Sequence, residues 1–286
     1  MDATRPPDGQ RYRRLRSAAR ALGAPRPVSA ERSGDPELLA LVSEPYRDAD
    51  EVRRGLSALL SAFEAREDRR AVFLGIYARM TAAVGRRIER DAFADSAWVA
   101  AYLVAFANRY RVAVRDFESG DIDALADPWQ LAFEAAEPGD SLVLQDAMLG
   151  MNAHINYDLE LALDDVGVGT DRPSKYADHC AIIDVIAELV DETQDALADR
   201  DADGLATLDS SLGRLDEWLT VATIDGCRDS AWRTAVAMDS RFRSRRRFAR
   251  WFNDRSATGA AHFIRSSRSS AVVHETLTGL EGSADD

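Results

Sequence analysis

The residues of this chain best suited to chemistry lie in the stretch GMNAHINYDL, which runs from position 150 to 159. Asn152, His154, Asn156 and Asp158 alternate there with mainly apolar or aromatic residues. On a helix, His154 and Asp158 are neighbours because residues four apart lie one turn from each other. A histidine beside a carboxylate is the arrangement of a general base with its orienting group, and equally of two metal ligands.

A second polar stripe follows the same predicted helix. Gln145, Asn152 and Asn156 fall close together on a helical wheel, on a different side from His154 and Asp158. Apolar residues interleave with both stripes, so neither is a solvated face, and we expect the helix to be buried nearly all round. A buried polar group without a partner costs about 1–3 kcal/mol, so these side chains should bond to one another or to a ligand.

A metal centre would need ligands beyond His154 and Asp158, because two ligands alone do not make a site. The helix expected after the motif follows a short connection, so it should pack antiparallel against the motif helix. That geometry brings Asp184 close to His154 and leaves His179 nearer the helix start, where a cap or surface position is expected. The predicted metal ligands are therefore His154, Asp158 and Asp184, holding one divalent ion.

Three functions are compatible with this pattern. In the first, the protein is an enzyme acting on a small molecule, with or without a metal, in which His154 and Asp158 are catalytic and Asn152 and Asn156 orient the substrate or neighbouring groups. In the second, it is a helical module that binds a small molecule without turnover. In the third, the polar groups only lock the packing of the helices.

Helical periodicity dominates the chain and predicts an all-α fold: a single bundle of about eight or nine helices around a buried central helix. We expect this domain to span residues 46–286, with no linker to a second domain. The later helices are predicted at 141–165, 175–199, 203–221, 228–253 and 257–278.

Residues 1–45 are rich in proline, glycine and arginine, with seven arginines in the first thirty positions. This composition predicts a flexible, basic N-terminal tail on an acidic body.

The composition restricts the location and partners of the protein. Its formal net charge is -13, and a single lysine, Lys175, stands among 36 basic residues. An aspartate-rich, arginine-rich surface suits a salt-filled cytoplasm, so we expect a cytoplasmic protein of a salt-accumulating microbe. The acidity argues against nucleic acid as the main partner. No apolar run reaches the roughly 18 residues of a membrane span, and the N-terminus lacks the apolar segment of a signal peptide.

The stretch LGMNAHINYDLELAL resembles the hallmark, GMNAHIN-x-DL, of an uncharacterised domain-of-unknown-function family of actinobacteria and salt-loving archaea. The match is closest from Gly150 to Leu159, and a looser similarity covers most of residues 46–250. The resemblance implies a helical fold. It implies no activity and no catalytic residues, and nucleotide-binding glycine loops, a GxSxG elbow and an HExxH motif are all missing from the sequence.

Overall fold

The computed structural model describes residues 34–137, 143–169, 171–198 and 221–266. Within these ranges the chain is helical without a strand, which confirms the predicted all-α class. The π-helical turn η1 joins α7 to α8 without a break, so the described residues form nine separate helices. The elements are α2 (Pro36–Leu41), α3 (Ala49–Glu64), α4 (Arg70–Glu89), α5 (Ser96–Glu118), α6 (Asp127–Ala136), α7 (Val143–Ala153), η1 (His154–Asp158), α8 (Leu159–Val166), α9 (Arg172–Ala198), α11 (Val221–Met238) and α12 (Arg243–Ser266).

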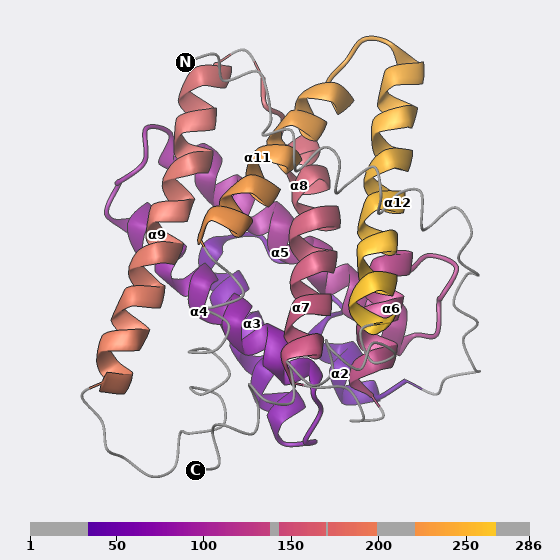
Figure 1. The fold of residues 1–286 in the computed structure, drawn as a ribbon. Coiled ribbons are helices and arrows are strands. Elements are labelled where there is room, and N and C mark those ends of the chain that lie inside the picture. Colours follow the sequence, from indigo (N-terminus) through magenta and orange to yellow (C-terminus); the bar gives the residue numbers. More distant parts are fainter. Residues whose placement is uncertain (1–33, 138–142, 170, 199–220, 267–286) are drawn as a thin grey trace.

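The continuous helix α7–η1–α8 lies at the centre of the bundle, as Figure 1 shows. Its α7 part packs against α4, α6 and α12, and its α8 part packs against α5 and α11. Side chains around its whole circumference are buried, among them Leu149, Met151, Leu159 and Leu163. The expectation of a central helix buried nearly all round is therefore confirmed.

Local signals explain where several helices begin and end. Asp35, Asp48 and Asp95 cap α2, α3 and α5, each accepting a hydrogen bond from a backbone N–H in the first turn. The central helix ends at Gly167, whose positive φ of 71° is a conformation that glycine adopts without strain. The GVG sequence that follows α8 thus stops the helix as its composition predicts.

The five residues of η1 form a π-helical turn inside the central helix. The N–H of Leu159 donates to the carbonyl of His154, five residues earlier, instead of the usual four. Such turns are rare and occur frequently at functional sites. Here the π-turn spans His154 to Asp158, so the local backbone irregularity coincides with the polar motif.

Gly150 allows α7 to lie unusually close to α4. A Cβ at this position would stand 2.4 Å from Cγ of Phe73 and 2.6 Å from its Cβ. Another side chain at position 150 would therefore displace the Phe73 ring, which packs beside His154. The small residue inside the motif serves a helix–helix contact.

The predicted boundaries differ from the structure at several places. The expected tail of residues 1–45 includes α2, whose Leu38 is buried in the core together with Val42, while residues 1–33 lie outside the described part. The helix predicted to start at 228 begins at Val221, and α12 continues through the break predicted between 253 and 257. The helix predicted at 203–221 lies almost wholly outside the described residues.

The largest difference concerns α9. It was expected to pack antiparallel on the central helix, but its main contacts are with α4 and α11. Figure 1 shows α9 at the edge of the bundle, away from α7 and α8. The short connection after Gly167 therefore leads the chain away from the central helix to the edge of the bundle. None of the described helices is both long and apolar enough to cross a membrane.

Candidate functional site

His154 and Asp158 form the predicted pair in the interior of the bundle. Nδ1 of His154 lies 3.0 Å from Oδ2 of Asp158, and each residue is 2% exposed. The same carboxylate oxygen accepts a hydrogen bond of 2.8 Å from Nε1 of Trp129, on α6. Two donors converge on Oδ2 when Nδ1 carries the imidazole proton, and this arrangement leaves Nε2 of His154 as a bare acceptor.

Nε2 of His154 is buried and meets no hydrogen-bonding group among the described residues. A buried polar atom without a partner is uncommon in folded proteins and requires an explanation. The explanation lies in what surrounds the ring, because the imidazole lies in an aromatic cage and borders a cavity.

The aromatic cage surrounds the imidazole with rings from α4, α5 and α6. Phe106 stacks on His154 with 3.6 Å between ring centroids and 11° between planes, and Tyr77 meets it edge-on at 4.3 Å. Phe73, Trp129 and Tyr110 complete the cage at centroid distances of 5.6, 5.9 and 6.0 Å. These rings fix the orientation of the imidazole and keep water from most of its surface.

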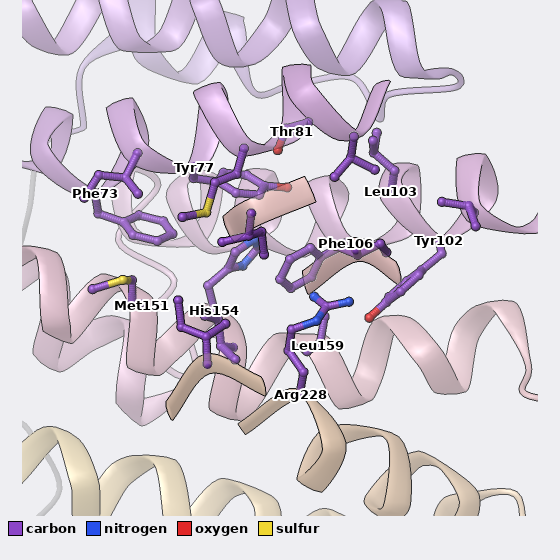
Figure 2. Close-up of a pocket in the computed structure, with 18 residues that line it drawn as sticks. Phe73, Tyr77, Thr81, Tyr102, Leu103, Phe106, Met151, His154, Leu159 and Arg228 are labelled. Atoms are coloured by element: carbon purple, nitrogen blue, oxygen red, sulfur yellow. The ribbon is translucent and has the colours of Figure 1, made fainter. Parts of the chain in front are cut away.

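A cavity of about 90 Å³ opens beside His154, and Figure 2 shows the side chains around it. Helices α4, α5, α9 and α11 and the central helix each contribute to its wall. The wall is almost entirely apolar. Its polar groups belong to five residues: Tyr77, Thr81, Tyr102, His154 and Arg228.

Burial shifts the pKa values of the pair in opposite directions. It lowers the pKa of His154 below the ordinary 6.5, and the adjacent Asp158 opposes that shift only in part. Burial also raises the pKa of Asp158 above 3.8, against the hydrogen bonds from His154 and Trp129. The imidazole is therefore held in its neutral form, the form in which Nε2 can accept a proton.

Asn152 and Asn156 take part in a different contact. The Nδ2 of Asn152 donates to the carbonyl of Ala257 on α12 at 2.9 Å, and Asn156 donates to Oδ1 of Asn152 at 3.1 Å. Neither asparagine lines the cavity. The structure thus separates the two polar stripes, placing the asparagines toward α12 and the His154–Asp158 pair toward the cavity.

Two further amides extend this contact between the central helix and α12. Gln145 donates to the carbonyl of Ile264 at 3.1 Å, and Asn253 donates to the carbonyl of Tyr157 at 3.0 Å. Together with Asn152 and Asn156 they form an amide ladder that joins the two helices. Its four members satisfy backbone carbonyls or one another, as buried amides require.

Asp184 is not brought to the pair. Its side chain is exposed on α9 and interacts electrostatically with Arg87, whereas Ile182 and Ile186 of the same helix face the cavity. The reason is the packing of α9 on α4 and α11 described above. In the part of the chain that the structure describes, no group of three or more histidine, cysteine or acidic side chains could hold a metal ion.

His179, expected at a cap or surface position, is instead 1% exposed. Its Nε2 lies 3.1 Å from the carbonyl of Arg228 and therefore carries the proton. Its Nδ1 then accepts from the hydroxyl of Tyr102 at 3.2 Å. Burial and the nearby Arg228 hold the pKa of His179 well below 6.5, so this imidazole is neutral as well.

Sequence reasoning missed Trp129, the aromatic cage and Arg228. Both residues lie in segments of ordinary helical spacing, and nothing in those segments indicates that Trp129 binds Asp158 or that Arg228 lines a cavity. Aromatic residues at helical spacing in α4 and α5 were a signal for a core, but no periodicity indicates which rings meet His154. These partners come from helices far apart in the sequence, so only the packing identifies them.

Comparison with known proteins agrees with the sequence resemblance. A search of the curated proteins and a search of the solved structures found no match. A model described as "Family of unknown function (DUF5995)" matches residues 49–267, which include the central helix and every residue of the cavity wall. The chain therefore belongs to DUF5995, a family whose function is unknown.

Proposed function

We propose that this protein binds a small, mainly apolar molecule in the cavity beside His154 and acts on it as an enzyme with His154 as general base. The observation that carries the proposal is that His154 lines the cavity while its buried Nε2 has no hydrogen-bond partner among the described residues. Asp158 holds the opposite ring nitrogen, so the imidazole has the orientation and tautomer of a base.

The surroundings of His154 suit this role. Burial keeps the imidazole neutral, and the aromatic cage fixes its plane. Asp158 stabilises the imidazolium that forms when Nε2 takes a proton, as a carboxylate does beside a catalytic histidine. The apolar wall excludes water and favours a ligand whose body is also apolar. The amide ladder fixes the central helix against α12 and so helps to hold His154 in place.

Binding can be tested with two molecules of similar size, phenol and toluene. Wild-type protein should bind phenol about fivefold more tightly in calorimetry, because only phenol can donate to Nε2 and a buried hydrogen bond contributes about 1 kcal/mol. His154→Phe keeps a ring of similar size but removes the acceptor, so it should lose this preference. Tyr110→Phe is the matched control: it removes a hydroxyl from a ring of the cage that does not line the cavity, so it should keep the preference. Equal preference in wild type and His154→Phe contradicts the proposed contact.

Catalysis can be tested through proton exchange. A general base in an apolar cavity should accelerate the exchange of α-protons of a small ketone, such as cyclopentanone, for deuterium. Proton NMR in deuterated buffer measures the rate, which should fall to the uncatalysed value in His154→Phe.

Non-catalytic binding is the second candidate, and the small number of polar groups in the cavity wall favours it. Phenol binding that depends on His154, without accelerated exchange, would support this second function over the first.

A further inference from the structure

Arg228 is a second polar group in the cavity wall, and its environment is unusual. It lies in the middle of α11 with 6% of its surface exposed. The Nη2 of Arg228 donates to the carbonyl of His179 at 3.0 Å. Its Nε, by contrast, is buried and has no hydrogen-bond partner in the described ranges. Figure 2 shows the guanidinium beside the hydroxyl of Tyr102, in the wall of the same cavity as His154.

No carboxylate neutralises this buried cation among the residues that the structure places. Asp229, the next residue, binds Arg233 at 2.8 Å and the hydroxyl of Tyr176 at 2.7 Å. Asp225, one turn earlier, is exposed. Arg228 contacts neutral groups instead: the backbone and the ring of His179, and the hydroxyl of Tyr102.

A buried charge without a counter-charge is strongly unfavourable, so buried arginines are normally paired with carboxylates or phosphates. The unpaired guanidinium borders a cavity, and a ligand there can supply the missing negative charge. A phosphate carries more charge and more oxygen atoms than one arginine and an apolar wall can satisfy. A carboxylate needs only the fork of donors that a guanidinium presents.

We infer that the ligand of this cavity is a small monocarboxylate with an apolar body. Its carboxylate pairs with Arg228, and its body packs against side chains such as Ile182, Ile186 and Ile224. This inference rests on the proposed function, because it assigns a chemical class to the molecule on which His154 acts. The ligand then carries its charge at Arg228 and presents its reactive proton to His154.

Three molecules of nearly equal shape test the assignment on the full chain: 3-methylbutanoate, 3-methylbutanamide and 3-methylbutan-1-ol. Calorimetry at neutral pH should show that the carboxylate binds at least tenfold more tightly than the amide, because its hydrogen bonds to arginine are charge-assisted. Shortening the apolar body to propanoate, which removes two carbon atoms, should weaken binding by about fourfold per carbon.

Arg228→Met keeps the length of the side chain without its charge. In this variant the carboxylate and the amide should bind equally within about threefold, while the alcohol binds as it does to wild type. Arg233→Met is the matched control. Arg233 lies on the same helix, but it binds Asp229 and does not line the cavity. It should retain the full preference for the carboxylate.

The outcomes separate this inference from the function on which it rests. If wild-type protein binds the amide as tightly as the carboxylate, or if Arg228→Met retains the preference, the carboxylate assignment is wrong and the cavity remains a site for neutral molecules. If none of the three molecules binds to wild type while phenol does, the assignment fails and the proposed function stands; if phenol also fails to bind, both fail. The wild-type comparison holds even if Arg228→Met does not fold.

Discussion

Trp129 donates its indole N–H to the same oxygen of Asp158 that faces His154, and the donor–acceptor distance is 2.8 Å. The indole comes from α6, whereas the acid lies at the end of η1, 29 residues further along the chain. The bond anchors the carboxylate in an orientation that leaves it free to hold the imidazole. The His154–Asp158 pair, which the sequence predicts, is thus two members of a three-residue arrangement that also includes Trp129.

This arrangement predicts different effects for two substitutions at Asp158. Asp158→Ala leaves the indole of Trp129 and Nδ1 of His154 without their shared acceptor, so it should lower the free energy of unfolding by about 3 kcal/mol. Asp158→Asn can present its amide oxygen to both donors and should cost about 1 kcal/mol. Urea denaturation measures both. Equal losses in the two variants would mean that the shared acceptor does not matter for stability.

Gly150 and Gly85 give opposite predictions for the same change. Gly150→Ala places a Cβ 2.4 Å from Phe73 and should destabilise the protein by about 1–3 kcal/mol through overpacking. At Gly85 in α4, nothing apart from the neighbouring residues and backbone of the same helix comes within 4 Å of the new Cβ. The higher helix propensity of alanine in Gly85→Ala should therefore stabilise the protein by about 0.5–1 kcal/mol. Thermal unfolding of the two variants tests this difference in sign. A stabilising Gly150→Ala would refute the close contact with Phe73.

The amide ladder predicts that Asn152 contributes to stability and not to binding. Asn152→Ala removes the bond to the carbonyl of Ala257 and should cost about 2 kcal/mol, whereas Asn156→Ala should cost less because this side chain is partly exposed. Hydrogen exchange should become faster in α12 of the Asn152 variant. The affinity of this variant for the cavity ligand should remain within about threefold of wild type. A larger loss would show that Asn152 contributes to ligand binding.

Buried neutral histidines make stability depend on pH. The folded pKa values of His154 and His179 lie below the ordinary 6.5, so below that pH the unfolded chain binds more protons than the folded one. The stability that these residues contribute is complete above pH 6.5 and is lost as the pH falls toward their folded pKa values. Each can contribute up to about 1.4 kcal/mol per pH unit.

His179 gives the cleaner measurement, because the raised pKa of Asp158 acts in the opposite sense as the pH falls and offsets part of the effect of His154. Denaturation at pH 7.5, 6.5 and 5.5 should show falling stability in wild type and a shallower fall in His179→Gln, whose amide can replace the donor at Nε2. Stability that rises between pH 6.5 and 5.5 would contradict the neutral, buried state of these imidazoles.

The sequence by itself determined the helical class, the burial of the central helix and the pairing of His154 with Asp158. These features follow from periodicity and from residues four apart, which any helix brings together. It also separated the asparagine stripe from the His154–Asp158 side, because both stripes belong to one helix. Local signals of this kind depend only on the geometry of a single element.

Only the tertiary structure decided what the two polar stripes lie toward: α12 for the asparagines and the cavity for the His154–Asp158 pair. The path of α9 after Gly167 excluded Asp184 and made room for a cavity, and the packing of α4, α5, α6 and α11 brought Phe106, Trp129 and Arg228 to it. The π-turn also has no signature in the residues that form it. Contacts between distant segments depend on how all the helices fill space together, and no spacing within one segment carries that information.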